Sequence, residues 1–117
     1  MKKSLVFAAA AVALMSMTTT ANAFSTTKCV ACHAIDHDKV GPAWKHVVAA
    51  YGDEATLAKV FESGFAVNDR KIAGSDAKWK GKAGLMTMQY KHLIKGHEKE
   101  VAHALFETVK NGKFGDY

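Results

Sequence analysis

The chain is short and mildly basic. It has 117 residues, with 16 Lys and Arg against 11 Asp and Glu, and only two cysteines. This length supports one small domain with a limited core. The net charge of +5 comes without a dense run of Lys or Arg, which argues against nucleic-acid binding.

Residues 1–23 have the pattern of a secretory signal peptide. Lys2 and Lys3 form a positive start, an apolar run extends from Leu5 to Met17, and Ala21-Asn22-Ala23 is a small-x-small cleavage site. The apolar run is shorter than the roughly 20 residues of a spanning helix, so no stable membrane insertion is expected after cleavage. Residues 24–117 then form one mature domain with 14 basic and 11 acidic residues. We expect it in the periplasm of a Gram-negative bacterium.

Both cysteines lie in one motif, Cys29-Val30-Ala31-Cys32-His33. Two cysteines three apart, followed at once by a histidine, form the attachment signature of a c-type haem. On a helical turn, residues i and i+3 share one face, so both thiols reach the two vinyl groups of one porphyrin. The adjacent imidazole can then bind the iron. The motif predicts one covalent haem c, held by Cys29, Cys32 and His33.

The cysteine pair has two other interpretations, and the rest of the sequence favours neither. A thioredoxin-like redox pair would need a βαβ context, and no strand pattern precedes the motif. Half of a zinc site would need two further ligands at close spacing, and the other histidines are scattered. A domain of this size often needs a stabilising element beyond its own core, and a covalent haem would supply it.

After the motif, apolar side chains recur with a helical period. Gly41-Pro42 is a helix-start signal, and Gly52 and Gly64 are stops for two successive helices, the second capped by Asp53. A third helix is expected over residues 97–109, ended by Asn111-Gly112. The apolar positions of the three helices are Trp44, Val47, Val48 and Tyr51, then Leu57, Val60 and Phe61, then Val101, Leu105 and Val109. No strand-like alternation is present, so the predicted class is all-α.

Residues 65–95 show no sustained period and contain several glycines among basic side chains. A long loop inside a compact domain is usually functional or disordered. In a haem protein it can cross the second face of the ring and supply a sixth ligand. The candidates are Met86, Met88 and His92.

The chain resembles the class I cytochromes c, of the short bacterial periplasmic kind that donates electrons to nitrite reductases and oxidases. The resemblance rests on CVACHAID at residues 29–36, Val40-Gly41-Pro42-Ala43, Trp44-Lys45, and the aromatic pair Phe24 and Phe106. It is strong over residues 24–61, moderate over 96–110 and weak between them. It implies a cytochrome c fold of about four helices around one covalently bound haem, with a long distal loop.

The resemblance also implies a methionine as the distal ligand. The family pattern is a glycine, any residue, an apolar residue, one more residue and then methionine, which Gly84-Leu85-Met86-Thr87-Met88 satisfies. We therefore expect Met88 to be the distal ligand. Met86 is the alternative, and His92 is less favoured than either methionine. A thioether ligand raises the potential relative to bis-histidine ligation. With both axial positions filled, the haem exchanges single electrons and the protein is a carrier between redox partners, not an enzyme.

The same segment suggests how a partner would bind. The resemblance places Trp79 where an indole N–H reaches a haem propionate, although the side chain could equally just cover the ring. An acidic redox partner would be steered by the lysines Lys78, Lys80, Lys82 and Lys91, unless these are simply solvated side chains. The protein itself is expected to be a monomer. The methionine stretch lacks the family's flanking prolines, which leaves an alternative function: a haem-based ligand sensor or peroxidase-like protein with a labile or absent distal ligand.

Overall fold

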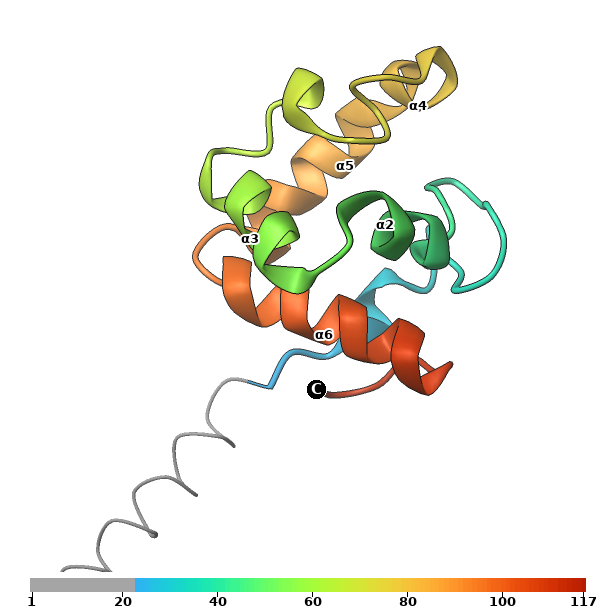
Figure 1. Ribbon diagram of the computed structural model, residues 1–117, viewed down its shortest axis with the longest axis vertical. Helices are drawn as coiled ribbons and strands as arrows, with labels where there is room; N and C mark the ends of the chain where they lie inside the picture. The colour runs from blue at the N-terminus through green and yellow to red at the C-terminus, as the bar shows by residue number, and fades with distance from the viewer. Residues whose placement is uncertain (1–22) are drawn as a thin grey trace, which may run out of the picture.

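A computed structural model describes residues 23–117, so the predicted signal peptide lies outside the described residues except for Ala23. This part of the chain is helical and contains no strand beyond one isolated bridge between Ser25 and Asp116. None of its helices has the length and apolarity to cross a membrane. The elements are η1 (Thr26–Cys29), α2 (Trp44–Tyr51), α3 (Glu54–Glu62), η2 (Val67–Asp69), α4 (Ala77–Gly81), α5 (Ala83–Gln89), η3 (Tyr90–Ile94) and α6 (Glu98–Asn111). The predicted all-α class is confirmed (Figure 1).

Helices α2 and α3 follow the sequence pattern closely. Gly52 (φ 83°) ends α2 in a conformation that favours glycine. Asp53 caps α3, because its Oδ1 accepts a hydrogen bond of 2.8 Å from the Thr56 backbone N–H. Helix α2 begins two residues later than Pro42, at Trp44.

Helix α6 is the element against which the fold is assembled. It packs against α3, α2 and η1, and it lies across the base of the domain in Figure 1. Gly112 ends it in the left-handed region, with φ 70°. The element before the haem motif, η1, has only four residues.

The two ends of the described chain pair with each other. Phe24 and Tyr117 exchange backbone hydrogen bonds of 2.9 and 3.1 Å. Next to them, the Thr26 hydroxyl lies 2.8 Å from the Thr108 hydroxyl of α6, and both side chains are fully buried. The N-terminal segment is therefore fixed to the C-terminal helix directly before the haem motif.

The prediction of a long loop without regular structure over residues 65–95 is wrong. The segment folds into the short helices η2, α4, α5 and η3. Asp76 starts α4 by accepting a 2.9 Å hydrogen bond from the Lys78 backbone N–H. Each of these helices has only three to seven residues, which is too short to give a recognisable period in the sequence.

The apolar interior is divided into two clusters. The larger combines α2, α3, η3 and α6, and its buried members include Trp44, Tyr51, Leu57, Phe61, Phe65, Ile94, Val101 and Leu105. The smaller consists of Ala73, Trp79 and Ala83, with Val67 and Ile72 packed against it. The two clusters line one common cavity, so the core has a gap at its centre.

Candidate haem-binding site

The central cavity has a volume of about 280 Å³. Its walls are mostly apolar and come from both core clusters, from the Cys29–His33 motif on one side and from α4 and α5 on another. An interior of a small domain is normally close-packed, so an apolar-lined gap between two core clusters is the kind of space that a bound apolar cofactor fills.

The haem motif forms one turn at the edge of this cavity. The backbone N–H groups of Cys32 and His33 both donate to the Cys29 carbonyl, at 3.2 and 2.9 Å. Both cysteines are half-buried, carry free thiols and line the cavity. The turn therefore brings the three predicted residues to one site, as the i, i+3 spacing indicated.

The Cys29 thiol does not have the electrostatics of a redox-active cysteine. Burial, together with the neighbouring Cys32, raises the pKa of Cys29 to about 11. Reactive cysteines of thiol oxidoreductases have lowered pKa values, because the thiolate is the nucleophile. The zinc alternative also finds no support, since residues 23–117 contain no group of three or more His, Cys, Asp or Glu side chains that could hold a metal ion.

His33 is prepared as a metal ligand. Its Nδ1 lies 3.0 Å from the Pro42 carbonyl oxygen. A carbonyl only accepts hydrogen bonds, so Nδ1 carries the proton and Nε2 has its lone pair free for a metal. Burial lowers the pKa of this histidine, which keeps the ring neutral.

Gly41 makes room for the imidazole. A Cβ at this position would overlap Cε1 of His33 and lie 2.8 Å from both ring nitrogens. The Gly41-Pro42 pair, which the sequence suggested as a helix start, instead forms the support beneath the histidine ring. Gly41 provides the space and Pro42 provides the hydrogen-bond acceptor.

On the distal side, the structure does not bring Met88 to the cavity. Met88 is 57% exposed and is not among the residues that line the cavity, whereas Met86 is half-buried and lines it. The physical reason is that both methionines lie on helix α5, where residues two apart point to different sides. The expectation of Met88 came from the family's glycine-to-methionine spacing, and ligation by Met88 stays a prediction. His92 is also exposed and lies outside the lining.

Sequence reasoning did not identify Arg70 as a site residue. Its side chain is 6% exposed, lines the cavity and has no carboxylate partner in the described chain. It donates instead to the Phe65 carbonyl, from Nε at 2.9 Å and Nη2 at 2.7 Å, and to Thr87 Oγ1 at 2.7 Å. Burial lowers the pKa of this guanidinium. The only sequence signal was an arginine within a lysine-rich segment.

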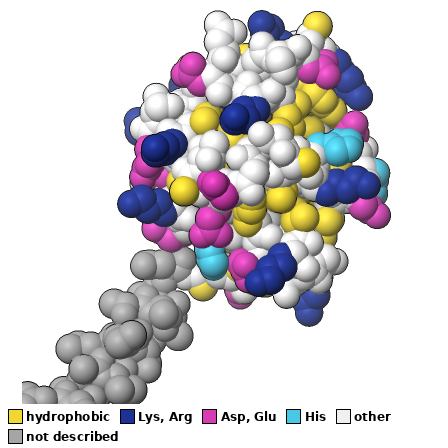
Figure 2. All heavy atoms as spheres, in the orientation of Figure 1, with side chains coloured by type: hydrophobic (Ala, Val, Ile, Leu, Met, Phe, Trp, Pro, Cys, Tyr) yellow, Lys and Arg dark blue, Asp and Glu magenta, His cyan; other side chains and the backbone are white. Residues whose placement is uncertain are grey.

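Trp79 and its lysine neighbours form the outer wall of the cavity. Trp79 is buried, and the ammonium groups of Lys78 and Lys82 lie 4.5 and 5.4 Å from its ring centroid. Lys80 and Lys91 are exposed, and Lys82 reaches the cavity rim. Figure 2 shows Lys and Arg side chains spread over the visible face, with apolar side chains between them.

An all-α domain with a Cys-x-x-Cys-His turn beside a central apolar cavity defines a c-type haem protein. The comparison of sequences agrees: the chain belongs to the cytochrome c family, which it matches over residues 19–113. It therefore carries one covalently attached haem c.

Part of the chain is similar to one particular bacterial cytochrome. The chain is 49% identical over 45 residues to cytochrome c-551 of Pseudomonas aeruginosa. That match covers 35% of this chain and 43% of the relative, so it spans less than half of either protein. No solved structure gives a significant match.

Proposed function

We propose that this protein is a monomeric periplasmic carrier of single electrons and not an enzyme. Haem iron with two protein ligands cycles between two oxidation states without changing its coordination. Support comes from the family, from the partial match to cytochrome c-551, and from two ligand candidates, His33 and Met86, among the residues that line one cavity.

His33 and Met86 are the axial ligands in this proposal. Both line the cavity, the first with Nε2 free and the second with its thioether on α5. The observation that carries the proposed function is that both side chains line this cavity, because two protein ligands would leave the iron no open position for a substrate or a gas. Cys29 and Cys32 would form the two thioether bonds.

Arg70 is suited to hold an anionic edge of the cofactor. A buried guanidinium without a carboxylate partner is costly, since desolvation disfavours the charged form. The haem propionates are the carboxylates that would reach this cavity. Arg70 would then bind the polar edge of the ring, while Trp79 covers it from α4.

The partner in this proposal is a redox protein with an acidic docking surface. Lys78, Lys80 and Lys82 surround Trp79 and are all exposed. Charged residues around a redox site increase the rate of encounter with an oppositely charged partner, and salt weakens the effect. The second-order rate of electron transfer should fall as the Debye length shrinks from about 30 to about 10 Å. A rate that does not depend on salt would remove the steering role from these lysines.

The function is tested by a redox titration of the haem-loaded protein, followed by exposure of the reduced form to carbon monoxide. We expect a reversible one-electron step and no change of the Soret band with carbon monoxide. Rapid carbon monoxide binding would favour the sensor or peroxidase-like alternative. Haem that is extracted by acid–acetone would contradict covalent attachment through Cys29 and Cys32.

A further inference from the structure

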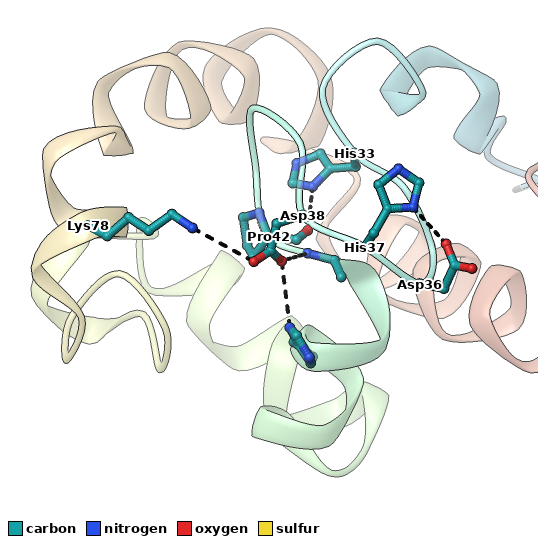
Figure 3. Close-up of polar contacts among 8 residues, drawn as sticks. His33, Asp36, His37, Asp38, Pro42 and Lys78 are labelled. Atoms are coloured by element: carbon teal, nitrogen blue, oxygen red, sulfur yellow. Dashed lines mark hydrogen bonds and ion pairs between the residues drawn. The ribbon is translucent and has the colours of Figure 1, made fainter.

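One peptide group, between Pro42 and Ala43, is held from both ends. Its carbonyl oxygen accepts the hydrogen bond from His33 Nδ1 at 3.0 Å. Its N–H, at Ala43, donates to Oδ1 of Asp38 at 2.8 Å. A carboxylate, a peptide and the proximal imidazole therefore form one continuous chain of hydrogen bonds (Figure 3).

Such a chain of hydrogen bonds transmits the polarising effect of the carboxylate charge to the imidazole. A hydrogen bond from a peptide N–H to a carboxylate is stronger than one between neutral groups, and it polarises the peptide so that its oxygen becomes more negative. A more negative carbonyl oxygen binds the Nδ1 proton more strongly. The imidazole then becomes a stronger electron donor through its other nitrogen, Nε2.

We propose that Asp38 is a positioning residue for the proximal ligand: through the Pro42–Ala43 peptide, it fixes the orientation of the His33 ring and increases electron donation from His33 to the iron. The inference rests on the proposed ligation by His33. It predicts that the negative charge of Asp38 stabilises the oxidised haem.

The surroundings keep Asp38 negative and in place. The Ala43 N–H is the main reason why the pKa of this carboxyl is lowered, and Lys78 and His46 also contribute. Lys78 Nζ, on α4, lies 3.9 Å from Oδ2, and His46 Nδ1, on α2, lies 3.6 Å from Oδ1. Asp38 thus joins the proximal loop to helices on both sides of it, as Figure 3 shows for Lys78.

Asp36 provides a matched control. It is a carboxylate in the same loop, two residues away, and it is exposed. Its side chain pairs with His37 at 2.9 Å and makes no hydrogen bond to the Pro42–Ala43 peptide. Changing either aspartate to asparagine removes one negative charge near the haem, but only one of the two changes alters the hydrogen-bond chain.

The experiment compares the haem-loaded wild type with Asp38→Asn, Asp38→Ala and Asp36→Asn. The reduction potential and the NMR signal of the His33 Nδ1 proton in the reduced state are measured for each. Asparagine keeps an oxygen that can accept from Ala43, so the loop keeps its fold while the charge is lost. Alanine removes both.

We expect Asp38→Asn to raise the potential more than Asp36→Asn does, and to move the Nδ1 proton signal upfield. The signal should stay in place in Asp36→Asn. In Asp38→Ala, the Nδ1 proton should also exchange faster with solvent. Equal rises in potential with an unmoved Nδ1 signal would overturn the inference and leave Asp38 as a loop cap. A wild-type spectrum without a metal-bound His33 would instead overturn the proposed function, and this inference with it, before any variant is compared.

Discussion

The two sides of the cavity are built by different kinds of interaction. On the proximal side, residues 29–45 are held mainly by backbone hydrogen bonds within the segment itself. The Gly41 N–H donates to the Cys32 carbonyl at 2.8 Å, and the Trp44 N–H donates to the Ala34 carbonyl at 3.0 Å. The proximal ligand is therefore placed by the local course of the chain.

On the distal side, side-chain hydrogen bonds link the short helices of residues 65–95 to one another and to α3. Arg70 binds the Phe65 carbonyl and Thr87, and the Tyr90 hydroxyl donates to the Phe61 carbonyl at 2.6 Å. The short helices of this segment take their places from these contacts. The difference teaches that a ligand fixed by local backbone geometry leaves a motif in the sequence, whereas one fixed by tertiary packing does not.

The largest effect is expected from the two methionines of α5. Met86→Ala should remove the iron–thioether absorption band in the far red, lower the potential and allow carbon monoxide to bind. It should also cost about 2–5 kcal/mol of unfolding free energy, because a cavity-lining side chain is lost. Met88→Ala, at an exposed position of the same helix, is the control and should leave the spectrum unchanged. The reverse result would restore Met88 as the distal ligand.

Gly41→Ala tests how rigid the proximal side is. The added Cβ would overlap His33, so we expect a loss of about 1–3 kcal/mol in urea unfolding and a disturbed spectrum. Gly84→Ala is the distal control. Nothing lies within 4 Å of a Cβ placed there, and alanine favours a helix over glycine by about 1 kcal/mol. If Gly41→Ala is neutral, the proximal loop is less constrained than its backbone hydrogen bonds indicate.

Tyr90→Phe tests whether side chains hold the distal segment. Loss of the buried hydrogen bond to the Phe61 carbonyl should lower the unfolding free energy by about 1 kcal/mol. Tyr117→Phe removes a hydrogen bond of similar length, 2.8 Å to the Lys113 carbonyl, from an exposed position. We expect it to have a smaller effect. Equal losses would indicate that burial of the Tyr90 contact is not important.

The smallest expected effect is on the pH dependence of stability. It concerns two carboxylates that each hold a turn, one in the proximal segment and one just after the distal segment. Asp38 binds the Ala43 N–H, and Glu98 binds the Gly96 N–H at 3.0 Å, just after the distal segment. These N–H groups lower the pKa of both carboxyls in the folded protein. Their stabilisation is therefore present above the unfolded pKa values, near 4, and is lost as the pH falls through the folded values.

Asp38→Asn and Glu98→Gln should accordingly lower the urea midpoint at neutral pH and have little effect at about pH 3, where the wild-type carboxylates are being protonated. Asp38 is exposed and Glu98 is only half-buried, so the difference will be slight. A variant that is equally destabilised at both pH values would show that the charge is not involved.

The parts of the structure that could be predicted follow the same division. Helices with a complete apolar stripe, such as α2, α3 and α6, were predicted to within about two residues at each end, and the Cys29–His33 motif that lines the cavity was recognised from its spacing. The short helices of the distal segment were missed, because their ends depend on caps and on distant contacts. Without knowledge of helix α5, the sequence could not show that Met86 lines the cavity and that Met88 does not.

Arg70 shows why some site residues remain hidden in a sequence. An arginine near several lysines is typical of a solvated surface, and the position of its guanidinium is determined by where the Phe65 carbonyl and Thr87 come together. That meeting point exists only after α5 has packed. Likewise, the sequence around Gly41 indicates only a helix start, whereas its closeness to His33 is visible only in three dimensions.

We expect the contacts of Thr26 with Gly115 and Thr108 to form late in folding. The Thr26 N–H donates to the Gly115 carbonyl at 2.9 Å, across 89 positions of the sequence. Contacts between such distant residues form late, because the entropy cost of closing a large loop precedes any gain. We therefore expect Cys29 and Cys32, which follow Thr26 within six residues, to stay accessible in a chain that is still folding, which is when a haem can be joined to them. Pulsed hydrogen exchange should show the Thr26 amide protected later than the amides within α6.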